Sequence, residues 1–211
     1  MKRSLFYLCI LALFFSCSSD EEENTVESQS NFYGLEVGNS WNYKIYQRNS
    51  QTQTLEYYGV DQDISVVGTE NLFGNIYYKI KVVTSGVENN SFDTPNGEVF
   101  QYRRIEGDTL LNENNFALFV NDNFTERLIS EEDWGDIYHQ TLEELATIEV
   151  DAGEFICAEM LEFGKNPEGE QLPGVNHIYY ADGIGLISYS VSYSNASITI
   201  YKTVLNSYNI Q

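Results

Sequence analysis

Cysteine and histidine are scarce in this sequence, which excludes several kinds of site. The chain has three cysteines, Cys9, Cys17 and Cys157, and only two histidines, His139 and His177. No Cys/His cluster with metal-ligand spacing accompanies them, so the sequence predicts no zinc or other metal site and no cofactor. Phosphate-binding glycine loops and the Gly-x-Ser-x-Gly elbow are also absent. The sequence therefore indicates no catalytic residue, which favours a protein that is not an enzyme.

Basic residues are few, and the resulting charge excludes nucleic acid as a partner. Eleven Lys and Arg residues stand against 32 Asp and Glu, and the formal net charge is −21 at pH 7. A surface with this charge repels phosphate backbones and anionic lipid head groups. We therefore expect no nucleic-acid partner.

The first 16 residues have the pattern of a signal peptide. Lys2 and Arg3 precede an apolar run from residue 4 to residue 15, as in secretory signal peptides. The run is shorter than the ~20 residues that a membrane-spanning helix needs. Ser16 and Cys17 follow, and the arrangement resembles a bacterial lipobox, whose cysteine is acylated and becomes the first residue of the mature chain. The alternative is an ordinary signal peptide with an incidental cysteine.

The lipobox resemblance implies that Cys17 is the lipid attachment site and that its acyl chains, palmitate among them, hold the protein on a membrane. Two or three buried chains, at ~0.8 kcal/mol per CH₂, give durable anchoring. Residues 17–30 are acidic and contain no aromatic residue, a composition typical of a flexible tether. The acidic cluster also resembles an export signal for the outer face of the outer membrane. We expect a bacterial outer-membrane location, exposed at the cell surface or facing the periplasm.

Residues 31–211 are predicted to form one all-β domain, because no linker divides them and their apolar residues alternate with polar ones. In the first such run, Trp41, Tyr43 and Ile45 alternate with polar neighbours, and Trp41 is expected to be a core anchor. Period-two alternation of this kind is typical of antiparallel sheets.

Later segments allow more detailed expectations. Asp151-Ala152-Gly153 is expected to link a strand over 145–150 to a central strand over 154–163, which has apolar residues on both faces. Cys157, among apolar neighbours, is expected to be a buried, inert thiol. Residues 130–145 are expected to form a loop with a helical turn or two, and residues 112–133 an exposed flap.

Three motifs in this order resemble a group of uncharacterised bacterial lipoproteins. Residues 37–41 read VGNSW, residues 152–157 read AGEFIC, and residues 179–187 read YYADGIGLI. The group is similar in presumed architecture to the lipoprotein-localisation (Lol) carriers. The resemblance implies a single large antiparallel sheet curved into a half-barrel. A β-sandwich and a closed barrel are the alternative folds. The group has no known catalytic residues to transfer.

Aromatic residues are the one surplus that suggests binding. The chain has 16 tyrosines and two tryptophans, and such rings often mark recognition surfaces. Trp134, Tyr46 and Tyr77 are the candidate binding residues, for a glycan, peptide or lipid ligand. Cross-strand aromatic pairing on a sheet face is the alternative explanation.

The sequence therefore favours a lipid-anchored cell-envelope lipoprotein with a non-enzymatic binding or structural β domain. Two alternatives remain open. One is a carrier or chaperone of lipid or lipoprotein that uses the concave side of its sheet. The other is a hydrolase acting on envelope or other glycans.

Overall fold

The computed structural model describes residues 31–87 and 95–211, so Cys17 and the rest of the predicted signal peptide and tether lie outside it. Within the described residues there is no helix, and hence none long and apolar enough to cross a membrane. These residues contain thirteen strands: β1 (Ser40–Arg48), β2 (Leu55–Leu72), β3 (Asn75–Gly86), β4 (Gly97–Glu106), β5 (Thr109–Asn112), β6 (Ala117–Val120), β7 (Arg127–Glu132), β8 (Gly135–Thr141), β9 (Ala146–Val150), β10 (Gly153–Lys165), β11 (Gln171–Ala181), β12 (Gly185–Ser192) and β13 (Thr199–Asn209).

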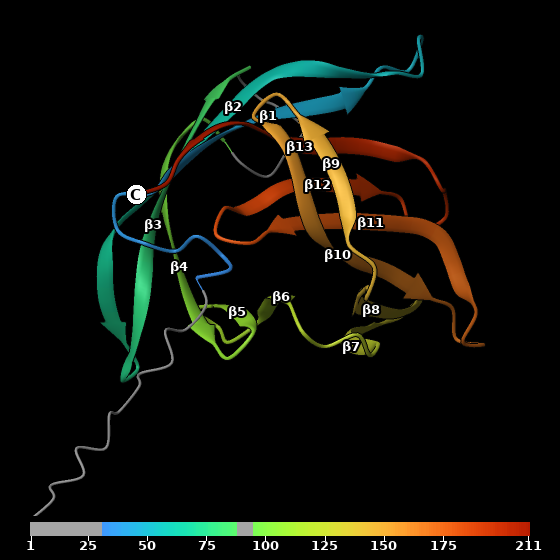
Figure 1. Cartoon of the computed structure of the whole chain (residues 1–211). Coiled ribbons are helices and arrows are strands. Elements are labelled where there is room, and N and C mark those ends of the chain that lie inside the picture. Colours follow the sequence, from blue (N-terminus) through green and yellow to red (C-terminus); the bar gives the residue numbers. More distant parts are fainter. Residues whose placement is uncertain (1–30, 88–94) are drawn as a thin grey trace, which may run out of the picture.

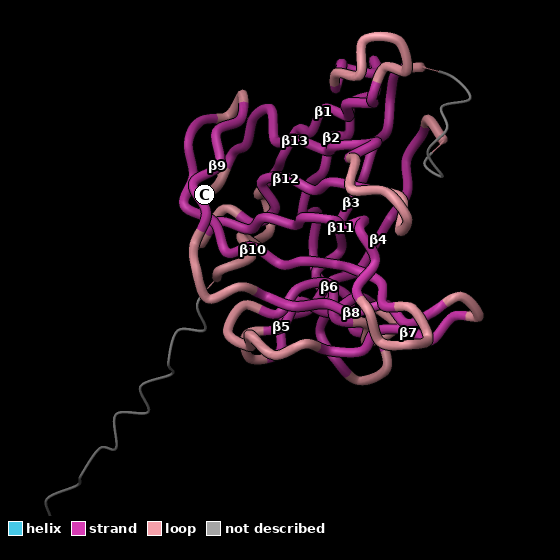
Figure 2. Tube along the Cα trace, turned by 90° about the vertical axis from the view of Figure 1, so that its right-hand side faces the viewer, coloured by secondary structure: helices cyan, strands magenta, loops and turns pink. Residues whose placement is uncertain are grey.

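All thirteen strands belong to one antiparallel sheet, which confirms the predicted fold class. The strand order is β6-β5-β4-β3-β2-β1-β13-β12-β11-β10-β8-β7. Figure 1 shows that the sheet is strongly curved, and in Figure 2 strands β5 to β8 gather at one end of the molecule. The sheet is not closed into a barrel, because β6 and β7, at the two ends of this order, do not pair. Side-chain contacts link the two ends instead: Thr141 donates a hydrogen bond to the carbonyl of Val120 at 2.6 Å.

Strand β10 has the central position that its sequence predicts. It pairs with β11 along one edge, and its other edge is shared between β9, through Gly153–Cys157, and β8, through Met160–Lys165. The predicted Asp151-Ala152-Gly153 link is the turn between β9 and β10. Cys157 is fully buried, as expected, and burial raises the pKa of its thiol to about 11.

The core lies on the concave side of the sheet. Trp41, Tyr43 and Ile45 alternate along β1 with more exposed residues, and each is no more than 7% exposed, so the prediction for Trp41 is confirmed. The segment before β1 packs against the same core. Gly34 in this segment has φ +62°, and a Cβ there would lie 2.7 Å from the carbonyl oxygen of Ile184. Only glycine lets the segment pack this closely.

Two expectations for the middle of the chain are wrong. Residues 130–145 hold no helical turn, because β7 and β8 form a hairpin there. Gly135, with φ +144°, lies so close to the carbonyl of Lys165 that a Cβ would be 2.1 Å from its oxygen. Nor do residues 112–133 form an exposed flap. They contain β6, and Phe119 in β6 is fully buried against Tyr33 and Tyr180.

Candidate functional site

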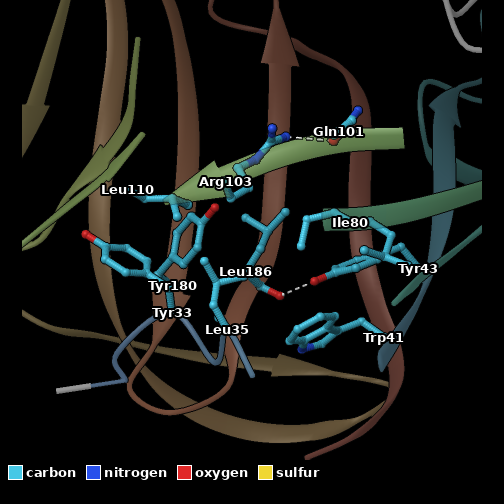
Figure 3. A pocket seen from close by; sticks show the side chains of 12 residues that line it. Tyr33, Leu35, Trp41, Tyr43, Ile80, Gln101, Arg103, Leu110, Tyr180 and Leu186 are labelled. Atoms are coloured by element: carbon cyan, nitrogen blue, oxygen red, sulfur yellow. Dashed lines mark hydrogen bonds between the residues drawn. The ribbon is translucent and has the colours of Figure 1, made fainter. Parts of the chain in front are cut away.

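The candidate site is a cavity of about 130 Å³ on the concave side of the sheet (Figure 3). Strands β1 to β5, the segment before β1, β11 and the start of β12 contribute its walls. The lining residues are mostly apolar or aromatic: Tyr33, Leu35, Trp41, Tyr43, Ile64, Ile80, Gln101, Arg103, Leu110, Tyr180, Gly185 and Leu186. Arg103 is the one charged side chain in this set.

The aromatic walls are held by hydrogen bonds to the backbone. The Trp41 indole N–H donates to the Ile184 carbonyl at 2.8 Å, and the Tyr43 hydroxyl donates to the Leu186 carbonyl at 2.8 Å. The Tyr33 hydroxyl donates to the carbonyl of Asp108. Burial raises the pKa of both Tyr33 and Tyr43 well above the ordinary value of 10. These rings are therefore neutral and fixed, and the walls are preorganised.

Arg103 is partly buried and bonds only to neutral groups. Its Nη2 donates to Oε1 of Gln101 at 2.7 Å, and its Nη1 donates to the carbonyl of Tyr102 at 3.1 Å. No carboxylate of the described residues forms an ion pair with it. Burial lowers the pKa of Arg103, against smaller opposing effects of Tyr180 and Glu113. A guanidinium stays protonated even so, and the cavity therefore has a positive charge at its wall.

A second polar cluster lies on β8, β10 and β11. Nε2 of His139 lies 2.8 Å from Oε2 of Glu162, and Nδ2 of Asn176 donates to Oε1 of Glu162 at 2.7 Å. The hydrogen bond from His139 is the main reason that the pKa of Glu162 lies below its ordinary value of 4.5. Both carboxylate oxygens are thus occupied by protein groups.

The second histidine forms a similar pair on the other face of the sheet. Nδ1 of His177 lies 2.5 Å from Oε1 of Glu159. Glu159 and Glu162 are three residues apart in one strand, so their side chains point to opposite faces. They therefore do not form the facing carboxylate pair that a glycosidase needs. No group of three metal-ligating side chains occurs in the part of the chain that the structure describes.

The residues singled out from the sequence do not come together. Cys17 lies outside the described residues. Trp134, in the β7–β8 turn, is 46% exposed and covers Gly164. Tyr46 is partly buried and its ring contacts that of Tyr57 at 6.0 Å, which is the cross-strand pairing offered as the alternative. Tyr77 is only 1% exposed and accepts a hydrogen bond from Arg104, so its ring has no surface to offer a ligand.

Sequence reasoning missed Arg103, Gln101 and Tyr180 as site residues. Tyr180 belongs to the YYADGIGLI motif and Trp41 to the VGNSW motif, and neither residue is among the binding residues predicted from the sequence. The remaining signal was weak. Arg103 is one of two adjacent arginines, and nothing in the sequence shows that one, Arg104, pairs with Glu106 while the other faces a cavity.

Comparison with known proteins places the fold but no activity. No protein-family model and no curated protein matches the chain. A Bacteroides fragilis protein described as exported, with a YmcC-like fold, shares 11% identity at a TM-score of 0.50, covering 84% of this chain and 98% of its own. A Parabacteroides distasonis protein described as a lipoprotein shares 16% identity at a TM-score of 0.43, with the same coverage. At these identities the likeness is one of fold, and the curved sheet is a YmcC-like fold.

Proposed function

We propose that this chain is an exported, lipid-anchored protein of the bacterial cell envelope whose β domain binds a small ligand on the concave side of its sheet. The cavity beside Arg103 is the observation that carries the binding role. Its walls are mainly apolar, with a few polar groups that converge on it, which is the usual composition of a ligand site. The anchor rests on Cys17 and the apolar run before it, and a protein of similar fold is itself described as exported.

The size of the cavity limits what it holds. Small-molecule sites commonly have ~300–1,000 Å³, and an engineered apolar cavity of ~150 Å³ holds one benzene molecule. A cavity of about 130 Å³ therefore accommodates one ring or a short aliphatic group. This volume is the reason that the proposal names a small ligand.

The anchor is tested by replacing the cysteine that carries it. We expect Cys17→Ala to abolish acylation of the chain, so that the intact mass of protein isolated from bacterial membranes no longer includes a lipid. Cys157→Ser is the matched control, because its thiol is buried in the fold, and the lipid mass should persist. A wild-type mass without lipid would overturn the anchor.

The location is proposed to be the outer membrane, with the domain facing outward because of the acidic residues that follow Cys17. Protease added to intact cells should then digest the domain. Replacing the four acids at positions 20–23 with their amides should protect it, because the export signal is lost. Equal protection of both proteins would place the domain on the periplasmic side.

The binding role is tested by native mass spectrometry of the full chain in a neutral detergent. A small adduct that is lost when Leu186→Trp fills the cavity would support the role. Folding of this variant is checked by its circular dichroism. An adduct retained in this variant, or a chain that never carries a ligand and binds none offered, would contradict the role.

A further inference from the structure

We infer that the cavity beside Arg103 binds the carboxylate group of a small monoanionic acid whose remainder is one aromatic ring or a short aliphatic chain. This inference rests on the proposed binding role and specifies the chemical class of the ligand. It comes from a cation that the protein leaves without a counter-ion, next to a cavity of the right size.

Of the nine Lys and Arg side chains in the described residues, Arg103 is one of four that form no ion pair, and it alone of these four lines the cavity. Five other cations of the described residues bond to carboxylates: Lys44 to Asp151, Lys79 to Glu70, Lys81 to Glu98, Arg104 to Glu106 and Lys165 to Glu126. Arg104 is the immediate neighbour of Arg103 and points to the other face of the sheet. The protein thus pairs one of these adjacent arginines with a carboxylate and leaves the arginine at the cavity with neutral partners.

Arg103 also has donors to spare. A guanidinium carries five N–H groups in a planar fork, and two of its nitrogens each make one bond, to Gln101 and to Tyr102. Gln101 holds the fork in place from the same face of β4, as the dashed line in Figure 3 shows. The remaining donors suit the two oxygens of a carboxylate, which guanidinium groups bind in bidentate geometry.

The surroundings favour one negative charge over two. The formal net charge of the chain is −21, and Arg103 is the only charged group in the cavity lining. A dianion such as a phosphate monoester would bring one charge that nothing at the site neutralises. The apolar remainder of the acid would contact Trp41, Ile80 and Leu186, where removal of apolar surface from water is favourable.

Glu113 is the one acid that acts on Arg103 through space. It forms no ion pair with Arg103, although it lies near enough to raise the pKa of the guanidinium. Its Oε2 is buried and has no hydrogen-bond partner. A bound carboxylate would be repelled by this oxygen. Removal of its charge should therefore strengthen binding, whereas a true counter-ion of Arg103 would be needed for stability.

The experiment uses benzoate as the probe and benzamide as its neutral isostere. The full chain in a neutral detergent carries Trp134→Phe, so that Trp41, in the cavity wall, is the only tryptophan. Its fluorescence reports binding while sodium chloride keeps the ionic strength constant. We expect benzoate to bind and benzamide to bind at least about tenfold more weakly, since it lacks the charge-assisted hydrogen bonds.

The variants separate the cavity arginine from charge in general. Arg103→Gln should weaken benzoate binding by about tenfold or more, and Glu113→Gln should strengthen it several-fold. Arg127→Gln is the matched control. Arg127 likewise forms no ion pair within the described residues, bonds to Met160 through its Nη2 and lies outside the cavity lining. Its replacement removes the same charge and should leave the benzoate affinity unchanged.

The possible failures are distinguishable. Equal binding of benzoate and benzamide, unaffected by Arg103→Gln, would overturn the carboxylate specificity and leave the binding role intact. Equal losses in Arg103→Gln and Arg127→Gln would show a general charge effect and would also overturn it. If neither probe binds, both the specificity and the binding role of this cavity fail. The membrane anchor is unaffected by this result, because it is tested separately by the intact mass of the Cys17→Ala variant.

Discussion

Two polar clusters on the concave side of one sheet have opposite hydrogen-bonding states. At Glu162, His139 and Asn176 occupy both carboxylate oxygens. At Arg103, the guanidinium has only neutral partners and unused donors next to a cavity. The carboxylate has a protein partner at each oxygen, whereas the guanidinium has donors left over.

The contrast distinguishes a charge that stabilises the fold from one that is available to a ligand. A partly buried carboxylate such as that of Glu162, with a hydrogen bond to each oxygen, contributes to stability, and loss of a partner is costly. A partly buried cation without a counter-ion has a desolvation cost that its contacts do not repay. The cavity wall, the Glu162 cluster and Arg103 should therefore differ in what their replacement does to stability.

Trp41→Ala should have the largest effect on stability. The ring is 7% exposed and its N–H is bonded to Ile184, so truncation should cost ~3–5 kcal/mol. The melting temperature should fall by roughly 10 °C. Thermal unfolding measures it, with Trp134→Phe as the control at a half-exposed ring. Equal melting temperatures for Trp41→Ala and the wild type would mean that the cavity wall is not part of the core.

Glu162→Gln should have a moderate effect. Glutamine is uncharged, so it cannot accept the two charge-assisted hydrogen bonds that the carboxylate accepts. The free energy of unfolding at neutral pH should therefore fall by ~1.5–3 kcal/mol. Glu149→Gln, at an exposed position of β9, is the matched control and should change it by less than ~0.5 kcal/mol. Similar values for the two variants would remove the distinction drawn between the clusters.

The contribution of Glu162 should also depend on pH in one direction. Its pKa in the folded protein lies below 4.5, so the folded state binds its proton less readily than the unfolded state. The stabilisation is complete above pH 4.5 and is lost as the pH falls from there through the pKa of the folded state. The difference between wild type and Glu162→Gln, measured by urea unfolding, should therefore shrink on acidification. If the difference in the free energy of unfolding grew towards acid pH, the pKa of Glu162 would have to be raised in the folded protein, not lowered.

Much of the fold could be predicted because it depends on local patterns. Alternation placed Trp41 in the core, and the Asp151-Ala152-Gly153 turn fixed the β9–β10 hairpin. The hairpin of β7 and β8 could not be predicted, because its acids resemble a helix start and it depends on Gly135 meeting the distant Lys165. The burial of Phe119 likewise depends on long-range contacts.

The site could be predicted less well than the fold. Its residues come from segments far apart in the sequence. The relevant feature of Arg103 is that it has no carboxylate partner among the described residues, and no sequence pattern predicts this. The aromatic candidates stand out in the sequence, but their surroundings in the structure differ. Tyr46 pairs with Tyr57 across two strands, and Tyr77 is buried. Only a structure separates these roles.

Arg103→Gln should have the smallest effect on stability. It removes no ion pair of the described residues and relieves the desolvation of a charge, so the free energy of unfolding should stay within ~1 kcal/mol of wild type or rise slightly. Urea unfolding measures this, and Arg127→Gln provides the comparison at a second unpaired arginine. A loss as large as that of Glu162→Gln would show that Arg103 holds the fold together, and the contrast between the two clusters would disappear. A neutral result in the same variant that loses benzoate would mean that the charge is retained for the ligand.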